Sequence, residues 1–135
     1  TYRYAYGRIT RGLADDIVRG TSRLNSIESL WVDLQAGRTV RCTQVPRFLP
    51  TRTTPDSDVN QEPQFLVMVQ ALDTAIAETN TAISLLDDAC NRAEPFITPD
   101  DITTALAAVD SARRNFNLAS SLFNPLQAQD PFTNR

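Results

Sequence analysis

The sequence predicts an all-α fold, a three-helix bundle whose helices run up, up and down, with one disulfide. Apolar residues recur at alternating spacings of three and four along three long segments, as one face of a helix requires. A proline-containing segment, residues 38–62, separates the first two; we call it the strap. The two cysteines, Cys42 and Cys90, then set the direction of the helices. With 135 residues and 41% hydrophobic content, residues 1–135 fit a single domain.

The first helix is expected at about residues 9–36. Gly20 lies in its apolar seam, where it costs about 1 kcal/mol of helix propensity relative to alanine. A close helix crossing explains this glycine, and a local kink explains it equally well. Gly37 suits the left-handed position that ends a helix. Trp31, on the same seam, is interpreted as a core residue rather than a ligand-stacking aromatic. The seam consists of Leu13, Ile17, Gly20, Leu24, Ile27, Trp31 and Leu34.

The strap cannot be helical where Pro46, Pro50 and Pro55 lie so close together, because each proline removes a backbone donor. Ordered domains rarely carry so long a connection without a reason. Its apolar residues indicate that it lies against the bundle. These residues are Val40, Val45, Phe48 and Leu49.

The second helix is expected at about residues 63–94, starting at Pro63, a residue favoured in a first turn. The extra apolar residues Leu66, Val67 and Met68 widen its buried face. Its seam consists of Phe65, Val69, Leu72, Ile76, Thr79, Ile83, Leu86, Cys90 and Ala93.

The third helix is expected at about residues 99–124. Thr98 can cap its free amides, Pro99 suits its first turn, and Asp100 and Asp101 complement the positive end of its dipole. Its stripe consists of Ile102, Leu106, Val109, Phe116, Ala119 and Phe123. Asn124 and Pro125 are expected to close the helix, which leaves residues 125–135 as an extended tail.

A disulfide between Cys42 and Cys90 constrains the topology. Cys42 can lie at most ~17 Å from the end of the first helix, whereas Cys90 lies ~40 Å from the start of the second. The bonded Cα atoms must be about 5.5 Å apart, so an antiparallel hairpin cannot close. The second helix must therefore run parallel to the first, and the strap, ~60 Å when extended, can make the return. Two free buried thiols are the alternative.

Many chemistries are excluded by composition. All 13 basic residues are arginine, and the chain has no histidine. There is therefore no Ser-His or Cys-His pair, no histidine zinc ligand, no Schiff-base lysine and no P-loop lysine. The chain is mildly acidic with no evident basic patch, which argues against nucleic-acid binding. We therefore expect no enzyme, no catalytic residues, no cofactor and no metal.

Two candidate sites in the sequence also have simpler interpretations. Residues 56–62 alternate oxygen ligands as a calcium loop does, but Gln61 stands where glycine is needed and Val67 where glutamate is needed. A polar loop before the second helix is the better interpretation. The carboxylate pairs are Asp15-Asp16, Asp87-Asp88 and Asp100-Asp101. Adjacent side chains on a helix point about 100° apart, so a hydrolytic site needs carboxylates from two different helices. A pair formed by Asp15 or Asp16 with Asp87 or Asp88 would meet that requirement, and the sequence leaves it open.

The N-terminal residues suggest a location. Tyr2, Tyr4, Tyr6 and their neighbouring arginines favour a membrane–water interface, as expected beside an anchor upstream of Thr1; packing on the first helix or a short strand are the alternatives. No apolar run approaches the ~18 residues of a membrane span, so the chain itself is expected to be soluble.

The function expected from these features is that of a non-catalytic interaction domain. The disulfide favours an extracytoplasmic location, either secreted, periplasmic or at the cell surface. The domain would be tethered through its N-terminus and would present a helix face or the strap to a protein partner. A ligand-sensing bundle of a membrane receptor is the alternative, and a carboxylate-dependent hydrolase is a distant third.

Overall fold

The computed structural model describes residues 2–93 and 96–128, and within these ranges the chain is helical and contains no strand. The prediction of an all-α chain is confirmed. Two single-turn 3₁₀ helices and a short α-helix accompany three long helices. In chain order the elements are α1 (Tyr2–Gln35), η1 (Cys42–Gln44), α2 (Asp56–Gln61), η2 (Pro63–Phe65), α3 (Leu66–Cys90) and α4 (Pro99–Ala128).

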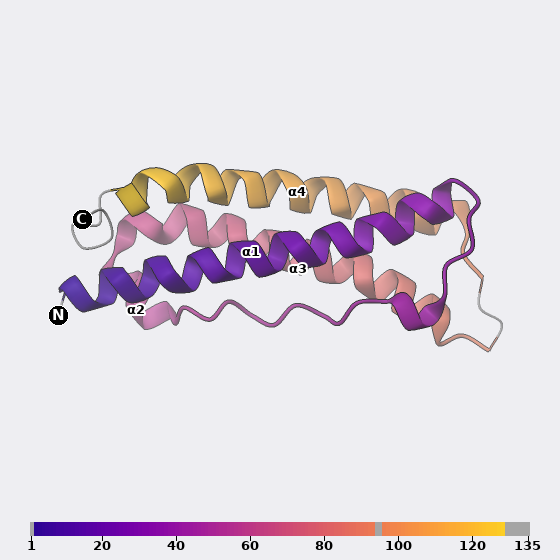
Figure 1. Cartoon of the computed structure of the whole chain (residues 1–135), viewed down its shortest axis with the longest axis horizontal. Coiled ribbons are helices and arrows are strands. Elements are labelled where there is room, and N and C mark those ends of the chain that lie inside the picture. Colours follow the sequence, from indigo (N-terminus) through magenta and orange to yellow (C-terminus); the bar gives the residue numbers. More distant parts are fainter. Residues whose placement is uncertain (1, 94–95, 129–135) are drawn as a thin grey trace.

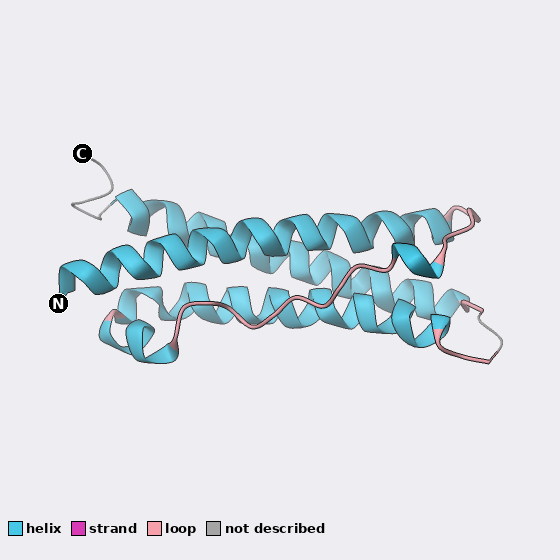
Figure 2. Cartoon of the chain, turned by 60° about the horizontal axis from the view of Figure 1, so that its bottom comes forward, coloured by secondary structure: helices cyan, strands magenta, loops and turns pink. Residues whose placement is uncertain are grey.

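The long helices lie side by side along one axis (Figure 1). In that view α1 leads away from the end marked N, and the strap returns along the bundle to that end. From there α3 runs in the same direction as α1, and α4 comes back. Figure 2 shows the strap as a thin extended chain that follows the long helices for much of their length.

The first helix is longer than expected at its start. It begins at Tyr2 rather than Ile9, because nothing in the tyrosine-rich segment breaks a helix, and it ends at Gln35. Gly37 adopts the expected left-handed conformation, with φ of 80°. The amide of Gly37 donates to Leu34 O at 3.1 Å and that of Arg38 donates to Asp33 O at 2.9 Å. This pair of bonds is a Schellman motif, which satisfies two of the terminal carbonyls.

The start of the second long helix differs from the expectation. Residues 56–61 form α2, the single turn η2 follows, and α3 begins at Leu66 rather than Pro63. Two aspartates in the first turn of α2 favour its N-terminus. Leu66 and Val67 were expected to widen the buried face, but both are exposed, and only Met68 is buried. Met68 is three residues beyond the buried Phe65, so the two side chains lie on the same face of the helix. Leu66 and Val67 lie on other faces and point to solvent.

The end of α3 and the end of α4 also differ from the expectation. The α3 helix ends at Cys90, not Glu94, which lies outside the described residues. The prediction that Asn124 closes the third helix is wrong, because α4 continues through Pro125 to Ala128. Proline lacks the amide that would bond four residues back, but its φ remains compatible with one further turn. The predicted extended tail therefore cannot start at 125, and residues 129–135 lie outside the described residues.

The start of α4 is the capping motif that the sequence predicts. The Thr98 hydroxyl accepts a hydrogen bond from the Asp101 amide at 3.1 Å. The Asp101 carboxylate in turn accepts one from the Thr98 amide, also at 3.1 Å. Each side chain thus satisfies a backbone donor at the helix start, which is the reciprocal arrangement of a capping box.

We expect Thr98→Ala to lower the free energy of unfolding by about 1 kcal/mol, the usual effect of losing an N-cap oxygen. Urea denaturation followed by circular dichroism measures this. Thr103→Ala is the matched control, because the exposed Thr103 hydroxyl only donates to Pro99 O within the helix. Equal midpoints for the two variants would show that the capping box does not stabilise the fold.

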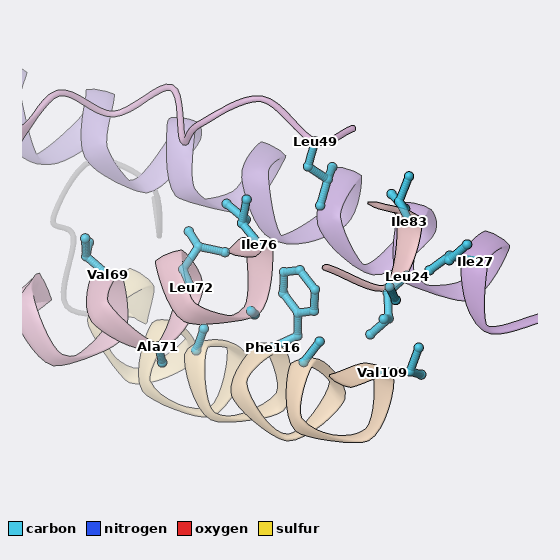
Figure 3. Packing of buried hydrophobic residues seen from close by; sticks show 14 of the residues in the cluster. Leu24, Ile27, Leu49, Val69, Ala71, Leu72, Ile76, Ile83, Val109 and Phe116 are labelled. Carbon is cyan, nitrogen blue, oxygen red and sulfur yellow. The ribbon is translucent and has the colours of Figure 1, made fainter. Parts of the chain in front are cut away.

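The core lies where the three long helices meet, and Phe116 of α4 is at its centre (Figure 3). A Cβ built on Gly20 of α1 would lie 2.5 Å from two atoms of the Phe116 ring. The close helix crossing, one of the two explanations left open by the sequence, is therefore the reason that glycine occupies this seam position. The prediction that Trp31 is a core residue is confirmed: it is fully buried, and its indole donates to Ala82 O at 2.9 Å.

Polar side chains tie α4 to both of its neighbours. Arg113 forms an ion pair with Glu28 of α1 at 3.0 Å, and the Asn115 amide donates to Glu78 of α3 at 3.1 Å.

In the ranges that the structure describes, no helix combines the length and the apolar content needed to cross a membrane.

Candidate functional site: the docked strap

The strap is joined covalently to α3 by the predicted disulfide. Cys42 and Cys90 are bonded, with their Cα atoms 5.8 Å apart, which confirms the pairing. The bond fixes the first turns of the strap to the last turn of α3. Because disulfides persist in oxidising compartments, it is consistent with an extracytoplasmic environment.

Side chains of α1 hold the outer edge of the strap by its backbone. The Arg23 guanidinium donates to the carbonyl oxygens of Arg47 and Phe48. Further along, the buried carboxylate of Asp16 accepts hydrogen bonds from the amide and the hydroxyl of Thr53, at 3.0 and 3.2 Å. Charged groups strengthen hydrogen bonds of this kind, so α1 fixes the strap at two separate points.

One asparagine of α3 holds the middle of the strap from the other side. Asn80 accepts a hydrogen bond from the Leu49 amide at 2.7 Å and donates one to the Leu49 carbonyl at 3.0 Å. Its side-chain amide thus satisfies both backbone groups of one residue, as a neighbouring strand does. The Leu49 side chain is 6% exposed and belongs to the core cluster, as its position in Figure 3 shows.

Ion pairs complete the docking where the strap approaches α2. Arg52 bonds to Asp73 of α3 and to Asp56 of α2, and it also donates to Thr54 O. Burial lowers the pKa of Arg52, but the hydrogen bonds and the negative charges of the two aspartates outweigh that effect and raise the pKa above its ordinary value. The guanidinium of Arg52 is therefore charged at neutral pH.

A second glycine of α1 allows the strap to approach closely. A Cβ on Gly12 would lie 2.5 Å from the Thr54 hydroxyl and 3.4 Å from that of Thr53. Such an approach to a helix backbone is open only to glycine. Gly12 lies outside the apolar seam that predicts α1, although a glycine eight residues before Gly20 in the same helix is a sign of close packing that the sequence carries.

The candidate calcium segment is α2, and its carboxylates have other partners. Asp58 forms an ion pair with Arg8 of α1 at 3.0 Å, and Asp56 forms one with Arg52. No group of three potential metal ligands occurs among the residues that the structure describes.

The structure does not bring the paired carboxylates together. Asp16 binds the strap at Thr53, whereas Asp87 lies one turn before Cys90, beside the disulfide. An extended stretch of the strap separates these two positions. Asp101 is occupied in the cap of α4, so the arrangement needed for a two-carboxylate hydrolase is not assembled from these residues.

The outward side of the strap is basic and carries an aromatic side chain. Residues 34–55 include four arginines and no acidic residue, a local excess that the charge of the whole chain hides. Arg38 and Arg52 have ion-pair partners, whereas Arg41 and Arg47 are exposed without one in the described part of the chain. Phe48, between Pro46 and Pro50, is 51% exposed.

Comparison with protein-family models, with curated proteins and with solved structures found no match to this chain.

Proposed function

We propose that the protein is a non-catalytic, extracytoplasmic interaction domain that binds a protein partner through the outward side of its strap. The proposed architecture is an up–up–down bundle tethered through its N-terminus. The observation that carries the proposal is the combination of a fixed strap backbone with an exposed Phe48. Arg23 donates to the carbonyl oxygens of Arg47 and Phe48, and Asn80 bonds to both backbone groups of Leu49.

Physical chemistry favours such a surface for binding. Aromatic and arginine side chains dominate the binding energy of protein interfaces. A backbone that is already fixed before association loses less conformational entropy on binding. Phe48 and Arg47 are adjacent on a segment bounded by two prolines, so both side chains are presented from a chain with little freedom to rearrange.

The charge of the strap defines the partner. Arg41 and Arg47 are exposed within residues 34–55, which contain no acidic residue, so the complementary surface is an apolar pocket for Phe48 with acidic residues at its rim. Exposed charges of this kind contribute chiefly to the association rate and to specificity. The disulfide supports the extracytoplasmic location, because an oxidising compartment preserves such a bond.

Photo-crosslinking in the native host tests the proposal. A benzoylphenylalanine at position 48 is expected to capture one protein, whereas the same group at the exposed Leu118 of α4 does not. With that protein purified, Phe48→Ala is expected to weaken binding at least tenfold, which is roughly 1.4 kcal/mol, and Leu118→Ala less than twofold. Capture that is equal at both positions, or equal affinities of the two variants, would refute the strap as the binding element.

A further inference from the structure

A groove between α1 and the strap, of about 470 Å³, lies beside α2 and is separate from the outward side of the strap. Arg8 and Arg11 line it from α1, and Thr53, Thr54 and Pro55 line it from the strap. Its volume is within the range of small-molecule sites. We propose that this groove binds a small oxyanion, a phosphate or a carboxylate, and this inference is independent of the proposed function of Phe48.

Of the charged side chains that face the groove, one cation has no ion-pair partner among the described residues. The Arg8 guanidinium is oriented by Asp58, to which its Nε and Nη2 donate at 3.3 and 3.0 Å. The carboxylate of Asp16 is occupied by Thr53. Arg11 is exposed and forms no ion pair within the described ranges of the chain, although Asp15 follows it by one helical turn. Guanidinium groups match the planar, divergent oxygens of oxyanions.

A buried hydroxyl provides an independent sign of a missing acceptor. Thr54 is 4% exposed, and its Oγ1 is buried with no hydrogen-bond partner among the described residues. Leaving such a group unsatisfied destabilises the folded protein. The hydroxyl lies against Gly12 and is closed to the groove in the free protein, so an oxygen held by Arg11 becomes its acceptor when the Thr54 side chain turns towards the groove on binding.

Thr54 also lines a larger groove on the other side of the strap, but its hydroxyl lies against Gly12, which lines only the groove beside α1. The larger groove has a volume of about 550 Å³ and lies between the strap and α3. Its arginine, Arg52, already bonds to two aspartates and a carbonyl, and its amide, Asn80, already bonds to Leu49. The one arginine and the one amide of this groove are therefore already engaged in docking the strap.

Calorimetric titration of the full chain with inorganic phosphate and with acetate tests the inference. Binding of at least one anion is expected, with Arg11→Gln lowering the association constant at least tenfold. Arg19→Gln removes the same charge from an exposed position of α1 outside the groove, and it is expected to change the constant less than twofold. If neither anion binds, or if the two variants weaken binding equally, the site does not exist as proposed.

A second variant separates ligand binding from packing. Thr54→Val keeps the shape but removes the unsatisfied hydroxyl, so it is expected to raise the melting temperature of the free protein while lowering phosphate affinity. An unchanged phosphate affinity would remove Thr54 from the site and overturn the inference. Short-chain phosphatidylglycerol, compared with free phosphate, distinguishes a lipid headgroup from a soluble anion as the source of the same chemistry.

Discussion

Replacing both cysteines by serine, Cys42→Ser with Cys90→Ser, is expected to lower the free energy of unfolding by about 4 kcal/mol. The bond joins residues 48 apart in sequence, and closing a loop of that length removes much conformational freedom from the unfolded chain. Such a loss is a large share of the stability of a small domain. Urea denaturation of the oxidised wild type and of the double variant measures it, and a difference below about 1 kcal/mol would contradict the loop-entropy account.

The same variant should loosen the strap unevenly. Apart from the disulfide, the stretch before Leu49 is held by the hydrogen bonds of Arg23. The stretch from Leu49 onwards is held by the buried Leu49 side chain, by hydrogen bonds to Asn80 and Asp16, and by ion pairs of Arg52. Segments with few buried contacts open locally at low free energy. Trypsin is therefore expected to cut first after Arg41 and Arg47 in the double variant. First cleavage after Arg52 would show that the strap opens from its other end.

The second large effect is expected at the helix crossing. Gly20→Ala should lower the free energy of unfolding by about 2 kcal/mol, even though alanine favours a helix by about 1 kcal/mol over glycine. The reason is steric, because the new Cβ would lie 2.5 Å from the ring of Phe116, which is held in the core. Thermal and urea denaturation both report this loss.

Two further variants make the prediction specific. Gly7→Ala is the matched control on the same helix, because the Cβ there would meet only the flexible end of Arg11, at 3.2 Å; we expect it to be neutral or stabilising. Phe116→Leu creates space opposite Gly20, so the double variant should lose less stability than the sum of the single changes. Strict additivity would show that the two residues do not compete for the same space.

The regular parts of the fold could be predicted because they depend on local spacing. The seams of α1, α3 and α4 follow the helical period, and the stop at Gly37 and the start at Thr98 carry capping signals within four residues. The Cys42–Cys90 bond could be predicted because only two cysteines are present. Where local signals conflict, the prediction failed: Pro125 suggested an end to α4, but one further turn is compatible with proline.

The docking of the strap could not be predicted, because it depends on pairs far apart in sequence. Nothing near Asn80 indicates that its amide will bond to Leu49, and nothing near Asp16 points to Thr53. The unsatisfied hydroxyl of Thr54 is likewise a property of the packed state alone. By contrast, the run of four arginines without an acidic residue over residues 34–55 was available from the sequence and required only a local count of charge.

Because Arg23 and Asn80 grip the main chain of the strap, the identity of its outward side chains does not affect how it is seated. Substitutions at positions 47 and 48 are therefore expected to leave the fold intact, whereas substitutions of Arg23 or Asn80 are expected to loosen the strap. A scaffold in which one set of residues fixes the backbone and another set faces outward can acquire new binding specificities by a few surface substitutions, while its fold stays the same.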